Sequence, residues 1–158
     1  MGLHGSYFSA LNEDCLKREK EIMEGSTGRG VLKIRQHWLR YSERVTPYIH
    51  ENCDIEEDST IGFNDIPAFR AGVASKYNPY DHIHKKPFSF KVIPLVLMDS
   101  HFYDYSSEDK NIGPLWLLEC AKNTKHFAIS IDWHQRVISD DYGWDGPYCK
   151  LAEKFLSI

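Results

Sequence analysis

Short apolar segments alternate with amphipathic segments along this chain, and the alternation limits the possible folds more than any other feature. The predicted strands are residues 31–35, 90–98 and 127–133. The predicted helices are residues 11–24, 42–52, 114–125 and 148–156. Repeated alternation of strands and helices favours a parallel sheet or barrel with helices on its outside.

Local signals predict where some of these elements begin, end or break. Ser9 or Asn12 can cap the first helix, and Gly25 is expected to end it. The segment 90–98 is the strongest candidate for a buried strand, but Pro94 within it indicates an edge strand or a bulge.

Composition narrows the class of protein. At 158 residues the chain is expected to form a single domain, residues 1–158. The net charge of −4 argues against nucleic acid as a partner, and no apolar run is long enough for a membrane span. The N-terminus lacks the pattern of a signal peptide, and the four cysteines are widely spaced, so we expect a cytoplasmic protein with reduced thiols.

The segment 58–72, DSTIGFNDIPAFRAG, has the composition of a functional loop. Gly62, Pro67 and Gly72 punctuate it, and charged or polar side chains such as Arg70 alternate with aromatic ones such as Phe69. Such a mixture is typical of a loop that lines a site. A rigid surface turn with a structural Arg–Asp pair is the alternative.

Three residues with catalytic potential each follow a predicted strand: His37, Asp99 and His134. The carboxyl ends of strands hold the chemistry in α/β proteins, so these residues are expected to converge at one rim. This pattern indicates a hydrolytic or metal site at a barrel mouth. His82 and His84 alternate as metal ligands on a strand would, but solvated loop histidines show the same pattern.

Five stretches in order resemble the polysaccharide deacetylase family, and most closely its bacterial subgroup linked to surface-polysaccharide gene clusters. They are GLHGSY, RQHWLR, DSTIGF with FRAG, PLVLMD and the late WH, and together they extend over nearly the whole chain. The resemblance implies a distorted (β/α) barrel that removes acetyl groups from N-acetylated sugars or polysaccharides. It also implies a divalent metal, often zinc, that an Asp and two His hold, with a second Asp as general base and a late His as general acid.

The resemblance suggests catalytic and metal-binding roles for five residues. His134 matches the late catalytic His, Asp99 would hold it in its working tautomer, and Arg35 would orient a carboxylate or contact the sugar. His4 matches the first metal-binding His. The second usually lies four residues further on, where this chain has a Phe, so His37 is the candidate in its place.

Four further residues are candidates for substrate binding. Trp38, Phe69 and Arg70 would line the sugar groove, and Trp133 would form a wall of the acetyl pocket. Aromatic faces suit sugar rings, although they also build ordinary cores.

The sequence departs from the family at its front, where the strand that ends in two Asp is expected upstream of GLHGSY. The resemblance therefore implies a partial barrel without its first strand or strands, in a C-terminal fragment, half of a split enzyme or a degenerate remnant. We expect such a chain to be weak or inactive alone, and an N-terminal partner segment or self-association would cover its exposed edges. The alternatives are a non-catalytic carbohydrate-binding or scaffold domain, and a soluble α/β domain with structural histidines.

Overall fold

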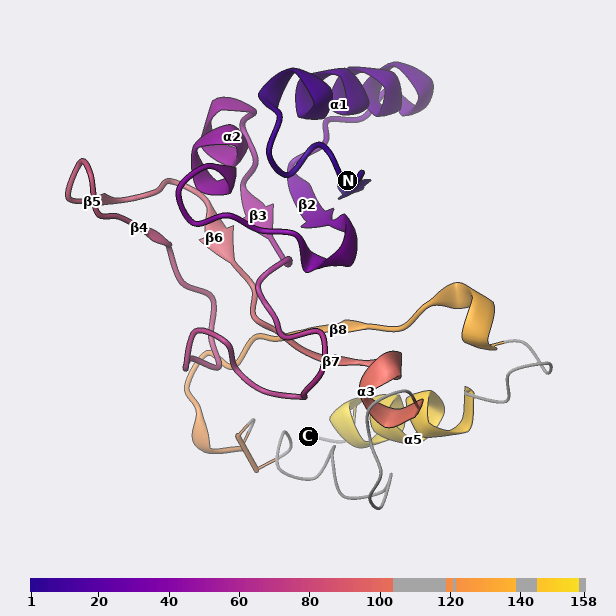
Figure 1. Ribbon diagram of the computed structural model, residues 1–158. Helices are drawn as coiled ribbons and strands as arrows, with labels where there is room; N and C mark the ends of the chain where they lie inside the picture. Colours follow the sequence, from indigo (N-terminus) through magenta and orange to yellow (C-terminus); the bar gives the residue numbers. More distant parts are fainter. Residues whose placement is uncertain (104–118, 121, 139–144, 157–158) are drawn as a thin grey trace.

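Parallel strands form the centre of the protein, which we describe from a computed structural model (Figure 1). The structure describes residues 1–103, 119–120, 122–138 and 145–156. A four-stranded parallel sheet has the order β1 (Gly2–Gly5), β2 (Lys33–Gln36), β3 (Glu57–Asp58) and β6 (Lys91–Val92). A second parallel pair joins β7 (Leu95–Met98) to β8 (Ser130–Asp132).

Pro94 divides the predicted strand 90–98 into β6 and β7. Proline has no N–H to donate to a sheet, but its carbonyl accepts a hydrogen bond of 2.7 Å from the N–H of Ser130. The N–H of Leu95 donates to the carbonyl of Ile61 at 3.0 Å, and the pairing of β7 with β8 is irregular between Leu95 and Leu97. The break that Pro94 indicates is therefore confirmed.

Two helices cover one end of the four-stranded sheet, α1 (Glu13–Thr27) and α2 (Thr46–Asn52) (Figure 1). Asn12 caps α1 by accepting a hydrogen bond of 2.9 Å from the N–H of Cys15, as the sequence allows. The prediction that α1 ends at Gly25 is wrong. The helix continues to Gly28, which ends it in the left-handed conformation at φ 65°. A buried cluster joins these helices to β2: Leu16, Ile34, Ile49, Cys53 and Ile55.

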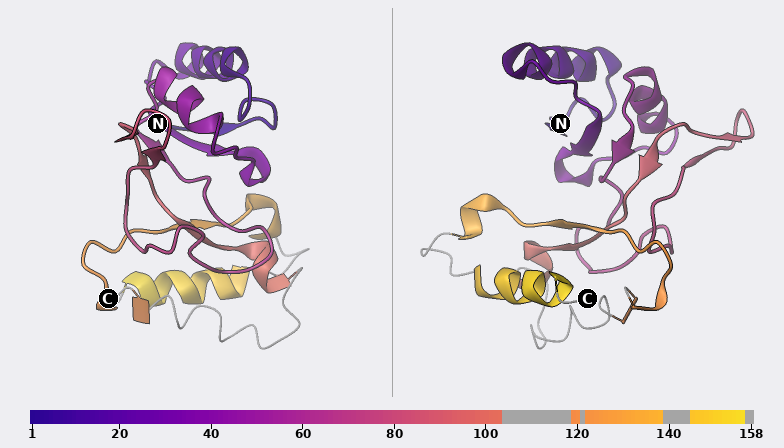
Figure 2. Two further views of the ribbon diagram at one scale, coloured as in Figure 1. Left: turned by 60° about the vertical axis from the view of Figure 1, so that its left-hand side comes forward. Right: turned by 180° about the vertical axis from the view of Figure 1, so that it is seen from behind.

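The second strand pair lies beside two other helices, α3 (Asp99–Tyr103) and α5 (Asp145–Leu156), in the lower part of Figure 2. Val96 and Leu97 of β7 are buried against Ile129, Ile131 and Trp133. The predicted C-terminal helix is confirmed as α5, whereas half of the predicted helix 114–125 lies outside the described residues, and residues 119–120 and 122–123 are helical. None of the helices described is long and apolar enough to cross a membrane.

These elements confirm the α/β class and the mostly parallel sheet. Neighbouring strands follow sequence order, as they do in (β/α) folds, but the strands that the structure describes do not close into a barrel. Several strands were missed in the sequence, β1 and β3 of the central sheet among them. The segment Gly2–Gly5 is too short and too rich in glycine to show a strand pattern, and it becomes β1 by pairing along the whole of β2.

A fully buried polar cluster connects β2, α2 and β3. The side chain of Gln36 donates to Nε2 of His50 at 3.1 Å, which leaves the His50 proton on Nδ1, 3.4 Å from Oδ2 of Asp58. Oδ1 of Asp58 accepts hydrogen bonds from the hydroxyl of Thr60 and from its N–H at 2.7 Å. The Ser9 hydroxyl donates to Gln36 Oε1 at 3.0 Å, so the cluster also fixes the loop after β1.

A short hairpin, β4 (Tyr80–Asp81) with β5 (Lys86–Pro87), extends away from the sheet (Figure 1). Asp81 is buried at the base of the hairpin and accepts four hydrogen bonds. The Tyr48 hydroxyl donates at 2.7 Å and the Ile83 N–H at 2.9 Å. His84 donates from its backbone N–H at 3.1 Å and from its imidazole at 2.6 Å. Burial alone would raise the pKa of Asp81, but these hydrogen bonds lower it well below its ordinary value.

The lowered pKa of Asp81 predicts a pH-dependent contribution to stability. A carboxyl group with a depressed folded-state pKa stabilises the protein above its unfolded value, about 4, and this stabilisation is lost as the pH falls towards the folded-state pKa. We expect Asp81→Asn to lower the urea midpoint at pH 7, by a difference that shrinks steadily below about pH 4. A difference that stays constant between pH 7 and pH 3 would contradict this role.

Candidate active site

The carboxyl ends of β2, β7 and β8 surround a cavity of about 490 Å³, which we call the histidine cavity. It is lined by His4, Gln36, His37, Trp38, Leu39, Asn64, Met98, Ser100, Asp132, His134 and Arg136. His4, His37 and His134, the three histidines with predicted catalytic or metal-binding roles, therefore line one cavity. They come together because the carboxyl ends of β1 and β2 in one sheet and of β8 in the other face the same cavity.

His134 forms a hydrogen-bonded pair with Asp99. Its Nδ1 lies 3.0 Å from both carboxylate oxygens, and its backbone N–H donates to Oδ2 at 2.9 Å. Asp99 is 2% exposed, whereas the His134 side chain is 44% exposed. The buried carboxylate places the Nδ1 proton between the two residues and leaves Nε2 on the opposite side of an accessible ring. This geometry suits proton transfer.

His4 and His37 form a second pair in the same cavity. Nε2 of His4 lies 3.0 Å from Nδ1 of His37, and their rings meet edge to face at 85°. Burial lowers the pKa of His4, and the neighbouring His37 lowers it further, while Asp132 acts in the opposite direction. The neutral imidazole, which is the form that binds metal ions, is therefore favoured at His4.

The two histidines fit part of a metal site. Two nitrogens that share one tetrahedral zinc ion lie ~3.3 Å apart, close to the separation of His4 and His37. A catalytic zinc normally takes three protein ligands. No group of three or more His, Cys, Asp or Glu that could hold a metal occurs within the described residues. His4 and His37 are therefore two nitrogen donors at a spacing that suits a metal, and we derive no reaction step through one.

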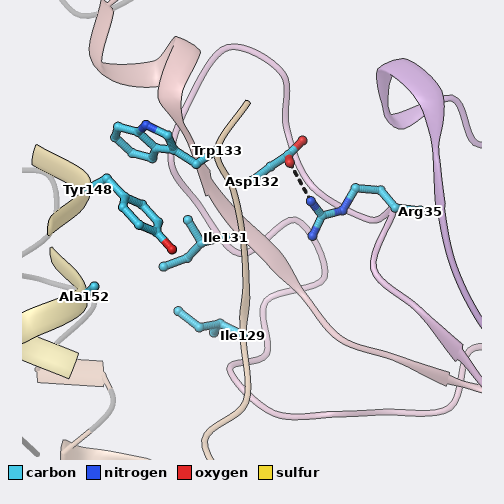
Figure 3. Close-up of a pocket in the computed structure, with 7 residues that line it drawn as sticks. All are labelled: Arg35, Ile129, Ile131, Asp132, Trp133, Tyr148 and Ala152. Atoms are coloured by element: carbon cyan, nitrogen blue, oxygen red, sulfur yellow. Dashed lines mark ion pairs between the residues drawn. The ribbon is translucent and has the colours of Figure 1, made fainter. Parts of the chain in front are cut away.

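An ion pair between Arg35 and Asp132 adjoins the histidine cavity. Nη1 of Arg35 lies 2.7 Å from Oδ1 of Asp132 (Figure 3). Arg35 also donates to the hydroxyls of Ser130 and Ser59, the latter at 3.2 Å. Arg35 extends from β2 of the four-stranded sheet to β8 of the second strand pair, so this ion pair links the two sheets.

A second cavity, of about 570 Å³, lies on the other side of Asp132 (Figure 3). We call it the tryptophan pocket. Its apolar wall consists of Ile129, Ile131, Trp133, Tyr148 and Ala152. The Trp133 and Tyr148 rings lie beside each other, with centroids 5.5 Å apart. Asp132 lines both cavities, so the tryptophan pocket adjoins the histidine cavity.

Trp38 stands at the rim of the histidine cavity. Its side chain is 74% exposed, and its backbone has a φ of 60°, a left-handed conformation that is rare for a bulky residue. The next residue, Leu39, is also left-handed at φ 51°. Strained backbone of this kind clusters at functional sites, and here it holds an indole ring in solvent beside His37.

Phe69 and Arg70 lie within the packing of their own loop. Phe69 packs against the buried Val96 and Leu97, and Arg70 donates to the carbonyl of Gly62 at 3.2 Å. From this loop it is Asn64 that lines the histidine cavity. The structure therefore brings His4, His37, Trp38 and His134 together, but does not place Phe69 or Arg70 among them.

Asp132 is the main site residue that the sequence prediction missed. The signal that could have found it is the alternation of side chains along a strand, which places residues 132 and 134 on the same side. Its Arg35 partner lies far away in the sequence, so no local pattern links the two.

The fold and this cavity define an α/β protein with polar groups at the carboxyl ends of parallel strands. Neither known protein families nor curated protein sequences give a match. Among solved structures, the chain is similar to a Bordetella bronchiseptica protein provisionally assigned as a polysaccharide deacetylase involved in O-antigen biosynthesis. The TM-score is 0.52 at 16% sequence identity. The match covers 87% of this chain and 51% of the Bordetella protein, so this chain spans about half the length of the Bordetella protein. The likeness shows a shared fold.

Proposed function

We propose that this protein is a hydrolase that removes acetyl groups from N-acetylated sugars of a surface polysaccharide, with the reaction in the histidine cavity. The observation that carries the proposal is the Asp99–His134 pair beside the His4–His37 pair in one cavity. The fold likeness supports it, since the similar protein is assigned to O-antigen biosynthesis.

Hydrolysis of an N-acetyl group consumes one water and releases acetate and a free amine. His134 is suited to give a proton to the departing nitrogen, because Asp99 holds its ring by Nδ1 and its other nitrogen stays accessible. The Asp99 carboxylate lies where the positive charge of the doubly protonated ring would form.

The tryptophan pocket would hold the acetyl methyl group. Trp133 and Ile131 form an apolar wall next to Asp132, which lies between this pocket and the histidines. Arg35 holds Asp132 through their ion pair and is itself held by two serine hydroxyls. Because side chains alternate along β8, this apolar wall lies on the opposite face of the strand from Asp132 and His134, so the methyl-binding role rests on the resemblance.

We propose that His4 and His37 hold a divalent metal, with zinc as the first candidate, and that the remaining ligands come from outside the described residues. When bound, such an ion polarises the amide carbonyl and activates water. An N-terminal segment or a second copy of the chain could supply these ligands, since β1 pairs only with β2 among the described strands. On this proposal, residues 1–158 form one domain, a distorted and partial (β/α) barrel.

Carbohydrate binding without turnover is the second candidate function. The observation that favours it is the exposed Trp38 at the rim of a cavity where the described residues offer two histidine donors, whereas catalytic zinc takes three protein ligands. A chain of this kind would use Trp38 and the tryptophan pocket to bind the polysaccharide.

Acetate release from an oligomer of N-acetylglucosamine, measured with and without added zinc, tests the proposed activity. We expect slow release that zinc increases and a chelator stops. Binding of the oligomer without acetate under either condition would contradict the hydrolase and leave the carbohydrate-binding function.

His4→Ala tests the metal proposal. Since the loss of a residue that merely orients a ligand costs about 10–100-fold in metal affinity, the loss of a ligand should cost at least as much. We expect calorimetry to show this decrease in zinc affinity, with the fold unchanged. His126→Asn, which alters an exposed histidine elsewhere, is the matched control. Equal zinc binding by His4→Ala and the control would remove His4 from the ligands.

A further inference from the structure

A third cavity, of about 670 Å³, lies between α2 and the β4–β5 hairpin, and none of the roles proposed above uses it. We call it the tyrosine pocket, after the aromatic residues that line it: Tyr41, Tyr48, Tyr77, Tyr80 and Phe88. Aromatic rings offer flat apolar faces, and tyrosine hydroxyls add hydrogen-bonding groups beside them. A sugar ring presents the complementary combination of apolar ring faces and hydroxyl groups.

The walls of the tyrosine pocket are held in place by contacts within the protein. The Tyr48 hydroxyl donates to the buried Asp81 at 2.7 Å, and its ring meets that of Phe88 edge to face, with centroids 5.1 Å apart. The Tyr77 backbone exchanges two hydrogen bonds with Val92 of β6, of 3.2 and 2.7 Å. A ligand would therefore enter a largely preformed site and would spend little binding energy on ordering it.

The rim of the pocket is polar and carries charges of both signs. Glu43 and Arg44 are neighbours and both exposed, and His82 packs edge to face against Tyr80 with centroids 5.2 Å apart. Tyr80 itself is 51% exposed. Opposite charges side by side favour a neutral, hydroxyl-rich ligand over an anion or a cation, because neither sign of charge dominates the entrance.

Two chain segments connect the tyrosine pocket to the histidine cavity. Leu39 lines the histidine cavity and Tyr41 the tyrosine pocket, so Cα atoms on the two walls lie at most ~7 Å apart. In the same way, Asn64 lines the histidine cavity and Ile61 the tyrosine pocket, three residues apart in the chain. One short oligosaccharide could therefore reach both the tyrosine pocket and the histidine cavity.

We propose that the tyrosine pocket is a subsite for another sugar unit of the same neutral, N-acetylated polysaccharide whose acetyl group enters the histidine cavity. The inference rests on the proposed function for its class of ligand. It adds that the protein binds an oligosaccharide over more than one unit, with Tyr80 as the exposed platform.

Calorimetric titration with N-acetylglucosamine and with its tetramer tests the subsite. We expect the tetramer to bind at least about tenfold more tightly than the monomer, and Tyr80→Ala to lose most of that advantage, because tenfold corresponds to about 1.4 kcal/mol, which is within the contribution of one aromatic contact. Phe8→Ala is the matched control, because Phe8 is a 70% exposed aromatic residue that lines neither cavity. The tetramer should also shift the backbone NMR signals of residues 77–88 in the unchanged protein.

The outcomes separate the subsite from the proposed reaction. If Tyr80→Ala binds the tetramer as the unchanged protein does, or the tetramer leaves the signals of residues 77–88 in place, the subsite is overturned. Acetate release with an unchanged KM in Tyr80→Ala would likewise leave the hydrolase standing without the subsite. Tetramer binding that depends on Tyr80, with no acetate released, would support the subsite and contradict the hydrolase.

Discussion

His134→Ala is expected to lower the rate of sugar deacetylation by about 10²–10⁴-fold, the usual contribution of a positioned general acid. The imidazole that Asp99 orients would be gone, and the leaving nitrogen would have to take its proton from water. The fold should remain intact, because the side chain is 44% exposed. Acetate release measures the rate, and circular dichroism checks the fold.

His126→Asn provides the control for this loss. Like His134, His126 is an exposed histidine, and Asn tolerates its left-handed backbone at φ 58°. The control should retain the rate of the unchanged protein. A His134→Ala variant that is as active as the control would end the assignment of His134 as the proton donor.

Asp58→Ala is expected to lower the free energy of unfolding by about 3–5 kcal/mol, as the removal of one partner from a buried pair does. The change would leave the N–H and hydroxyl of Thr60 without their acceptor, and it would remove the carboxylate oxygen that lies 3.4 Å from Nδ1 of His50. These groups are fully buried, so water could not replace the carboxylate without opening the structure.

Urea denaturation of Asp58→Ala and of Glu56→Ala would measure this effect. Glu56 is an exposed carboxylate two residues away, and its loss should change stability by less than about 0.5 kcal/mol. If the two variants are equally stable, the cluster of Gln36, His50, Asp58 and Thr60 does not hold β2, α2 and β3 together.

The parts of the fold that could be predicted from the sequence depend on local signals. The apolar segments became strands, Asn12 became a helix cap, and Pro94 broke its strand, because propensity and hydrogen-bonding capacity act over a few residues. The convergence of His37, Asp99 and His134 could also be predicted, since parallel strands end at the same edge.

The remaining features depend on contacts between distant residues. β1 exists because Gly2–Gly5 pairs with β2, some 30 residues further along the chain. The Arg35–Asp132 ion pair joins β2 of one sheet to β8 of the other, a contact that no local pattern encodes. The loop after β3 has the mixture of polar and aromatic residues that is typical of a functional site. Because Phe69 packs on β7, it is Asn64 of this loop that lines the histidine cavity.

Product stoichiometry is the most direct test of the proposed hydrolase. The purified chain would be incubated with zinc and an N-acetylglucosamine oligomer, and both acetate and new primary amine would be counted. The proposal predicts equal amounts of the two products, and a parallel loss of both in His134→Ala. Absence of amine, with or without acetate, would contradict amide hydrolysis in the histidine cavity.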